Sequence, residues 1–80
     1  MIDYRNHIVR DPELCGGEPV FRGTRVTLRT VLASLAEGAG VDDILADFPT
    51  LKPDDVRAAI AFAAASAQED LPLAELPNVA

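Results

Sequence analysis

The sequence has little cysteine and few aromatic side chains, and each shortage limits what the protein can be. Cys15 is the only cysteine among 80 residues, so no disulfide can form within the chain, as suits a reducing compartment. Trp is absent, and the only aromatic residues are one Tyr and three Phe. Aliphatic side chains and alanine must therefore fill the core of a single small domain.

Long apolar runs and targeting segments are missing as well. The longest apolar run, residues 58–65, is far shorter than the ~18–20 residues of a membrane span. The first ten residues carry Asp3, Arg5, His7 and Arg10 and have no apolar stretch of the kind found in a signal peptide. We therefore expect a cytoplasmic protein without a membrane partner.

Side chains suited to catalysis or metal binding are scarce. One His and one Cys offer no nucleophile–base pair with a third, orienting group, and no Cys or His pair has metal-ligand spacing. His7 and Cys15 are more simply interpreted as a surface histidine and a buried structural cysteine. We expect no enzyme activity, no catalytic residue, no metal and no cofactor.

The net charge of −6 is unevenly distributed along the chain. Residues 1–29 hold five arginines against four acids, a balance of +1, whereas residues 30–80 hold two basic residues against nine acids, a balance of −7. A solvated acidic half beside a nearly neutral one is the simpler interpretation. The alternative is that the five arginines form a basic patch that contacts phosphate in spite of the negative chain.

Residues 1–26 are predicted to form an arm of short strands and turns. Residues 7–10 are predicted to be a strand ended by Asp11-Pro12, residues 13–15 a second short strand, and residues 19–22 a further one. Such short strands are not stable alone, so they must pack on the rest of the chain or pair with another copy.

Three helices are predicted within residues 27–68. Thr27 caps the first, which ends at Gly38; the second lies between Gly40 and Pro49; the third begins at Pro53. Their apolar faces are Leu28, Val31, Leu32 and Leu35, then Val41, Ile44, Leu45 and Phe48, then Val56, Ala59 or Ile60, and Ala63.

The third helix is almost wholly apolar over residues 58–67. This pattern indicates burial on more than one side, or, since alanine tolerates exposure, an alanine face that meets a second subunit. We therefore expect a homodimer, formed through this face or through a sheet shared by the N-terminal segments.

Residues 69–80 are predicted to be a flexible tail, since they contain two prolines and alternate acids with leucines. Leu71, Leu73 and Leu76 are its candidate partner-binding residues.

Nucleic-acid contacts are predicted around the turn after residue 21. Arg22 and Arg25 bracket a glycine turn with Thr24, and Arg29 follows on the first helix, which together make a phosphate-contacting surface. In the alternative interpretation these arginines pair with nearby acids, among them Glu18.

The second and third helices, joined by residues 49–52, also fit a helix-turn-helix. This motif adds Lys52 and Arg57 as candidate DNA-binding residues, although Asp54 and Asp55 at the start of the third helix would repel phosphate.

A family resemblance joins these segments. The stretches that carry it are Asp11-Pro12, Gly16-Gly17-Glu18-Pro19-Val20-Phe21-Arg22-Gly23-Thr24-Arg25-Val26, Leu32 with Leu35-Ala36-Glu37-Gly38, Asp42-Asp43-Ile44-Leu45 and Asp47-Phe48-Pro49. They resemble domain-of-unknown-function family 433 over about residues 8–66. Members of that family are similar to winged or homeodomain-like helix-turn-helix proteins, and are often the antitoxin half of a VapBC-type pair encoded beside a PIN-like ribonuclease toxin. Lys52 stands where family members often carry Ser or Thr, which weakens the helix cap and adds a positive charge.

These observations together predict a mainly α fold, a three-helix helix-turn-helix domain with a short N-terminal β-arm. The resemblance implies an antitoxin-like DNA-binding regulator that also binds a PIN-like toxin, with operator DNA as a further partner. The alternative is a protein-interaction or dimerisation module without DNA binding, which the acidic isoelectric point near 4.4 favours.

Overall fold

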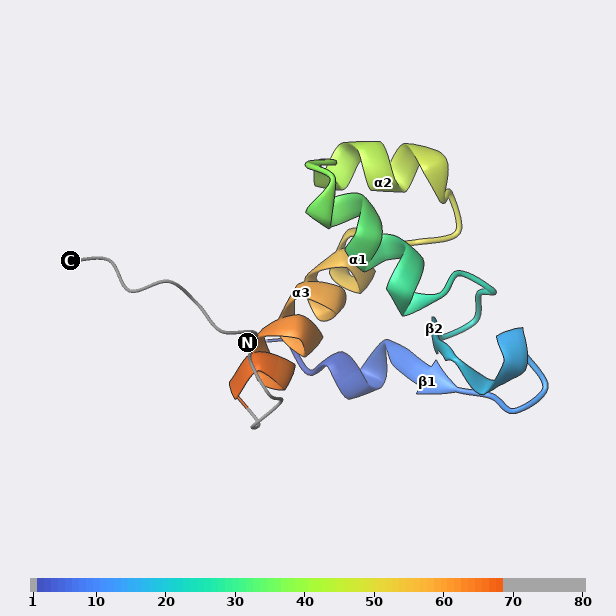
Figure 1. Ribbon diagram of the computed structural model, residues 1–80. Coiled ribbons are helices and arrows are strands. Elements are labelled where there is room, and N and C mark those ends of the chain that lie inside the picture. Colours follow the sequence, from blue (N-terminus) through green and yellow to red (C-terminus); the bar gives the residue numbers. More distant parts are fainter. Residues whose placement is uncertain (1, 69–80) are drawn as a thin grey trace.

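The computed structural model describes residues 2–68, and in that part of the chain three helices are joined to a two-stranded sheet (Figure 1). In chain order the elements are the short 3-10 turn η1 (Tyr4–Asn6), β1 (Ile8–Arg10), the 3-10 turn η2 (Cys15–Gly17), β2 (Pro19–Phe21), α1 (Leu28–Ala36), α2 (Val41–Asp47) and α3 (Pro53–Gln68). The predicted class, mainly helical with a short N-terminal β segment, is confirmed. The tail predicted for residues 69–80, with Leu71, Leu73 and Leu76, lies outside the described residues.

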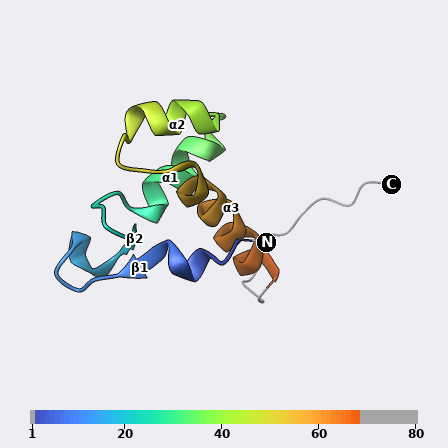
Figure 2. The same ribbon diagram turned by 180° about the vertical axis from the view of Figure 1, so that it is seen from behind.

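The elements are arranged with the sheet at one end of the molecule and α2 at the other. Figures 1 and 2, which view the molecule from opposite sides, both show α1 and the first part of α3 between these two ends, and the last part of α3 beside the N-terminal segment. Within residues 2–68 no helix is both long and apolar enough to cross a membrane.

The sheet is an antiparallel pair in which Val9 lies opposite Val20. The further strand predicted at residues 13–15 is wrong, because Cys15 begins the 3-10 turn η2. Cys15, Gly16 and Gly17 have φ angles of 51°, 66° and 82°. This left-handed backbone, which glycine adopts without strain, cannot continue a strand. Cys15 is also exposed, so the prediction of a buried structural cysteine is wrong.

The helix boundaries follow the predicted signals. The Thr27 side chain accepts a hydrogen bond from the backbone N–H of Thr30 at the start of α1. Gly38 follows α1 with a φ of 95°, where a side chain would be strained. The backbone N–H of Gly40 donates to the Asp43 carboxylate over 2.8 Å, which satisfies one of the free amides at the start of α2.

The core lies where β2 and the three helices meet. Its buried cluster consists of Phe21, Leu28, Val31, Ile44, Leu51, Val56 and Ala59. In α3, Val56 and Ala59 are fully buried, whereas Ile60 is 50% exposed and Ala63 is exposed too. The predicted core line of α3, which offered Ala59 or Ile60 at its middle position, is therefore right at Val56 and Ala59 and wrong at Ala63, since the second half of α3 packs on the N-terminal segment instead. There the rings of Tyr4 and Phe62 meet edge to face, with centroids 5.4 Å apart.

Candidate functional site

A polar pocket of about 410 Å³ lies where η1, the turn after β2 and the start of α3 come together. We call it the β2–α3 pocket; its lining residues are Asn6, His7, Arg22, Gly23, Thr24, Thr50, Lys52 and Asp55. Three of the six residues predicted to bind DNA, namely Arg22, Thr24 and Lys52, line this one pocket. They come from segments about 30 positions apart in the sequence, so the fold and not their spacing brings them together.

Asp55 is the buried acid of the pocket, with only 7% of its surface exposed. One carboxylate oxygen lies 3.0 Å from Nδ1 of His7, and the other accepts the backbone N–H of Lys52 over 2.9 Å. This contact engages Nδ1 of His7 and leaves Nε2 for other partners. Both carboxylate oxygens of Asp55 are thus occupied inside the fold.

His7 is consequently not the simple surface histidine that the sequence suggested. Its side chain is 26% exposed, and Asp55 supplies the orienting group that sequence analysis did not find. The sequence predicts an acid at the start of the third helix, and the bond of Asp55 to the Lys52 amide agrees with this; the bond to His7 is additional. These two residues are 48 positions apart, and nothing in the sequence signals that they meet.

The two cations of the pocket are Arg22 and Lys52. The Nε of Arg22 donates to the carbonyl oxygen of Asn6 over 3.1 Å, which fixes the side chain beside the pocket. Among residues 2–68, no carboxylate lies within ion-pair distance of Arg22 or Lys52. Both side chains are exposed, so their charges are available to an anionic ligand.

Thr24 lines the pocket in a structural role. Its hydroxyl donates to the carbonyl oxygen of Phe21 over 2.8 Å and accepts the backbone N–H of Val26 over 3.1 Å. Gly23, with a φ of 78°, allows the turn to close. The Thr24 hydroxyl proton is therefore used to hold the turn that carries Arg22 and Arg25.

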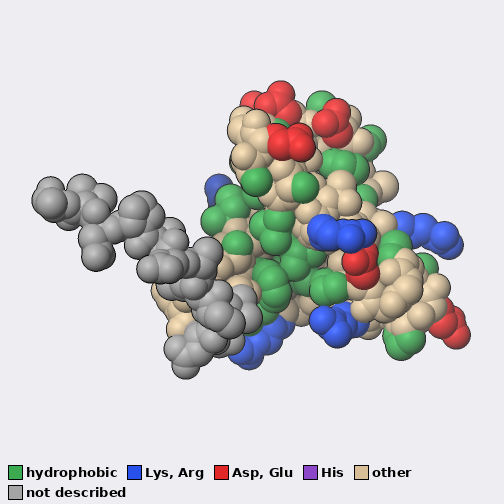
Figure 3. All heavy atoms as spheres, in the orientation of Figure 1, with side chains coloured by type: hydrophobic (Ala, Val, Ile, Leu, Met, Phe, Trp, Pro, Cys, Tyr) green, Lys and Arg blue, Asp and Glu red, His purple; other side chains and the backbone are tan. Residues whose placement is uncertain are grey.

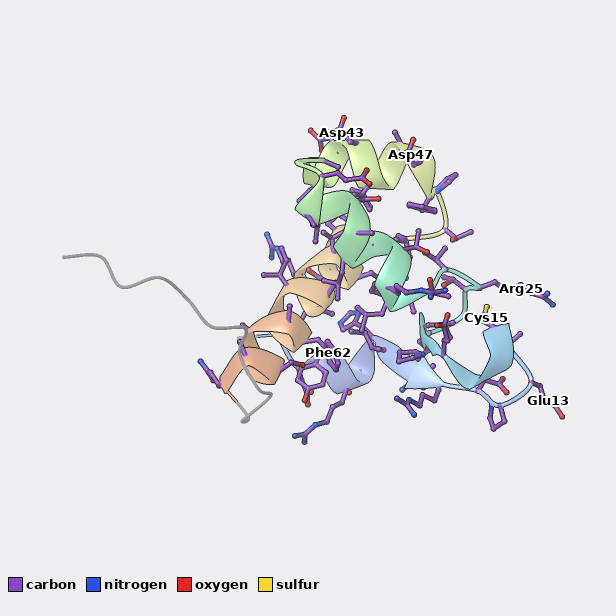
Figure 4. All side chains as sticks on the ribbon, in the orientation of Figure 1. Glu13, Cys15, Arg25, Asp43, Asp47 and Phe62 are labelled. Carbon is purple, nitrogen blue, oxygen red and sulfur yellow. The ribbon has the colours of Figure 1, made fainter. Side chains whose placement is uncertain are left out.

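The other three candidate residues lie outside the pocket. Arg25 projects outward from the same turn, away from the helices (Figure 4), and lines a neighbouring hollow with Thr24. The Nη2 of Arg29 lies 3.3 Å from a carboxylate oxygen of Glu18, so the ion-pair interpretation holds for this arginine. The Nη1 of Arg57 lies 3.7 Å from the Asp54 carboxylate, and Arg57 lines a different hollow along α3.

Acidic side chains gather at one end of the molecule without basic neighbours in view. Figure 3 shows Asp and Glu side chains over α2, whereas the Lys and Arg side chains in view lie over the rest of the molecule, where further acids lie among them. Asp43 and Asp47 lie on α2, which forms the end of the molecule opposite the sheet (Figure 4). The acids at the start of α3 are partnered: Asp54 by Arg57, and Asp55 inside the fold.

Metal-ligand geometry is not found in the described part of the chain. Among residues 2–68 no group of three or more His, Cys, Asp or Glu side chains is placed to hold a metal ion.

Comparisons with known proteins give one consistent result. The family model described as "Protein of unknown function (DUF433)" matches residues 8–63. The uncharacterized protein y4eO of Sinorhizobium fredii is 39% identical over 62 residues, which are 78% of this chain but only 28% of that protein. The crystal structure of a DUF433 member from Anabaena variabilis superposes with a TM-score of 0.70 at 31% identity, covering 81% of this chain and 64% of the other. The chain therefore spans less than a third of the length of its curated relative and just under two thirds of the crystallised one.

Proposed function

The chain belongs to the DUF433 family, and we propose that it is an antitoxin-like regulator that contacts operator DNA through the β2–α3 pocket and also binds a PIN-like ribonuclease toxin. The observation that carries the DNA part is the pair of unpaired cations, Arg22 and Lys52, in one concave polar site with Arg25 next to it.

The position of the pocket fits a helix-turn-helix. In that motif the first residues of the second helix face the duplex. Here α2 and α3 would be the two helices, and Lys52 immediately precedes Pro53, the first residue of α3. The turn that carries Arg22 and Arg25 lies beside this helix start, where it would contact the DNA backbone as a wing does.

The chemistry of the pocket favours phosphate contacts over base reading. Arginine and lysine are the main ligands of phosphate oxygens in protein–DNA interfaces. Among residues 2–68 no carboxylate lies within ion-pair distance of Arg22, Lys52 or Arg25, so a duplex at the pocket would meet unneutralised cations although the whole chain carries −6. Operator selectivity would then come from a few contacts at the start of α3.

DNA binding is tested by titrating the full chain against its own upstream region and against a random duplex at several salt concentrations. Each phosphate contact releases counterions, so Arg22→Ala and Lys52→Ala should each reduce the slope of log K against log salt by about one. Arg57→Ala is the matched control, because Arg57 is paired with Asp54 away from the pocket, and its slope should not change. Equal affinity of the wild type for both duplexes, even at low salt, would exclude operator binding.

Toxin binding is proposed from sequence alone, through Leu71, Leu73 and Leu76 outside the described residues. Leucines that alternate with acids suit a groove that is apolar and basic, as in a nuclease that binds RNA. Replacing the three leucines by serine in the full chain should abolish inhibition of a PIN-like nuclease encoded beside the gene, with the circular dichroism spectrum unchanged. Full inhibition by this variant would exclude that role.

A second function, protein interaction without DNA binding, is favoured by a different surface. Ile60 is 50% exposed on α3, among alanines that line a hollow with almost no polar surface. The salt titration separates the two functions, because an interaction module would show no salt-dependent DNA affinity.

A further inference from the structure

The β2–α3 pocket contains a titratable side chain that the proposed DNA contacts do not use. His7 lines the pocket together with Arg22 and Lys52, and its Nδ1 atom lies 3.0 Å from the carboxylate of Asp55. The other ring nitrogen, Nε2, makes no hydrogen bond within residues 2–68. In that part of the chain no buried side-chain nitrogen or oxygen lacks a hydrogen-bond partner. Nε2 is therefore not buried, and a ligand in the pocket can reach it.

The charge of the pocket favours an anion, and His7 can increase that charge. Arg22 and Lys52 are the cations of the pocket and Asp55 is its acid, so these groups give it a charge of +1 with neutral His7 and +2 with protonated His7. Both carboxylate oxygens of Asp55 are engaged, one by His7 and one by the backbone of Lys52. Asp55 therefore holds the imidazole ring, while the two cations are left for a ligand.

The ionisable side chains of η1, which directly precedes His7, are engaged elsewhere. Tyr4 packs edge to face against Phe62. Arg5 lies over the Tyr4 ring, with its Cζ atom 5.8 Å from the ring centroid. The charges that act on His7 within the pocket are thus the two cations, the Asp55 carboxylate and the charge of any ligand.

The donors around the pocket fit a phosphate group. They come from three segments of the chain that border one hollow of about 410 Å³, a volume within the range of ligand pockets. The Nε atom of Arg22 is held by the carbonyl oxygen of Asn6, which leaves the two Nη atoms for a ligand. A terminal phosphate offers three acceptor oxygens and up to two negative charges, whereas a carboxylate offers two oxygens and one charge.

We propose that the β2–α3 pocket binds one phosphate group of a nucleic acid and that His7 is its third ligand, after Arg22 and Lys52. Asp55 is a positioning residue. A carboxylate beside Nδ1 favours a proton there, so Nε2 gains its proton, and becomes a donor to the phosphate, when the imidazole is charged. Binding then takes up a proton at His7, and affinity rises as the pH falls. The proposal rests on the proposed function, because it concerns the pocket that is assigned there to DNA.

Sulfate tests the pocket without DNA, because it is tetrahedral and stays a dianion over the range in which imidazole titrates. An NMR titration of the full chain with sulfate, at constant ionic strength, follows the ring nitrogens of His7 and the backbone amide of Gly23, which also lines the pocket. We expect saturable binding that weakens roughly tenfold from about pH 6 to about pH 8, through the loss of one proton. Equal affinity at both pH values, or no saturable binding near pH 6, would overturn the proposal.

Two replacements of His7 separate the roles of its ring nitrogens. His7→Asn places an amide nitrogen near the position of Nδ1 and has no group at Nε2. It should keep the contact with Asp55, bind sulfate roughly tenfold more weakly near pH 6 and lose the pH dependence. His7→Gln places an amide nitrogen near the position of Nε2 and should bind sulfate without pH dependence.

Arg57→Ala is the matched control for these variants, because Arg57 pairs with Asp54 outside the pocket. It should change neither the affinity for sulfate nor its pH dependence. Circular dichroism checks that each variant folds. A folded His7→Asn variant that binds sulfate as the wild type does, with the same pH dependence, would show that Nε2 is not a ligand.

Failure of this site and failure of operator binding give different results. Sulfate binding that depends on His7, without any preference for the upstream region over a random duplex, supports the phosphate site and excludes operator binding. Operator affinity that depends on Arg22 and Lys52, with sulfate binding that is the same in His7→Asn, leaves operator binding in place and overturns the role of His7.

The source of the phosphate is identified by titrating duplexes with and without 5′-phosphates near pH 6 and pH 8. A gain in affinity at the lower pH that requires the 5′-phosphate supports a terminal phosphate as the ligand, and an equal gain for both duplexes supports a backbone phosphate. In either case His7→Asn should remove the gain. A gain that persists in His7→Asn would overturn the assignment of the proton to His7.

Discussion

The Nδ1 atom of His7 lies 3.0 Å from a carboxylate oxygen of Asp55, and this bond ties the N-terminal arm to the first turn of α3. The second oxygen of Asp55 accepts the backbone N–H of Lys52. One buried carboxylate thus caps α3 and fixes the arm that carries β1. The β2–α3 pocket is built on this pair of contacts.

Replacing Asp55 by alanine should therefore destabilise the fold. The change removes both hydrogen bonds and leaves a partly buried imidazole and amide without their acceptor, at a cost of about 2–3 kcal/mol. For a domain of this size the loss corresponds to roughly 10–20 °C in the melting temperature. Thermal unfolding followed by circular dichroism measures it.

Asp54→Ala is the matched control for this change. Asp54 is the neighbouring acid, but its pair with Arg57 is exposed, with 60% and 73% of the two side chains accessible. Exposed ion pairs contribute little, so its loss should cost less than about 0.5 kcal/mol. Equal destabilisation by the two variants would contradict the structural role of Asp55.

The sequence predicts the local contacts of this structure but not its tertiary ones. The start of α1 at Thr27, its end at Gly38 and the start of α3 at Pro53 are local signals, since each depends on backbone groups a few positions away. They were predicted correctly. The bond between His7 and Asp55 is tertiary, and no periodicity or spacing encodes it. The sequence therefore predicts single residues of the pocket, such as Arg22 and Lys52, but not that they line one site.

The errors in the sequence analysis have the same origin. Cysteine is among the residue types most often buried, which predicted the interior for Cys15. The two glycines after it instead favour a left-handed turn that places it on the surface. Ala63 shares the periodicity of the α3 core, but α3 is longer than the helices it packs on. Periodicity shows that a face is apolar; what covers that face depends on the length of its neighbours.

Thr24 should contribute to stability more than to DNA affinity. Thr24→Val keeps the shape of the side chain but removes the hydrogen bonds to Phe21 and Val26, and we expect a loss of about 1–2 kcal/mol in the free energy of unfolding. Thr24→Ser keeps the hydroxyl and should retain most of that stability. Chemical denaturation compares them. A stable Thr24→Val variant that has lost DNA binding would instead indicate a direct contact to DNA.

Ile44 and Val41 provide a test of the core within one short helix. Ile44 is 1% exposed, so Ile44→Ala should cost about 2–4 kcal/mol through lost burial and the cavity left behind. Val41 is 39% exposed on the same helix, and Val41→Ala should change stability by less than about 0.5 kcal/mol. Urea denaturation at a common temperature measures both. A similar cost for the two variants would mean that α2 does not pack on the core as described.

The ion pair between Glu18 and Arg29 leads to the last prediction, which concerns DNA affinity. Arg29 lies on α1 with 79% of its side chain exposed, and Glu18 neutralises it at 3.3 Å. If the surface that carries Arg22, Arg25 and Arg29 faces the duplex, Arg29 contributes little to DNA affinity as long as it is paired with Glu18. Glu18→Gln should then raise affinity at low salt, because it removes a negative charge and releases Arg29 to contact phosphate.

The effect of Arg29→Ala on the salt dependence of DNA binding should differ between chains with and without the Glu18 carboxylate. In the wild type, Arg29→Ala should change the salt slope by much less than the unit expected for Arg22→Ala, whereas in a Glu18→Gln background Arg29→Ala should reduce it by about one. Anisotropy titrations of the four chains of this double-mutant cycle, at several salt concentrations, give the coupling directly. If Arg29→Ala lowered the slope equally in both backgrounds, the ion pair would not compete with DNA. If neither background responded, Arg29 would lie outside the DNA-contacting surface, which would then be confined to the β2–α3 pocket and Arg25.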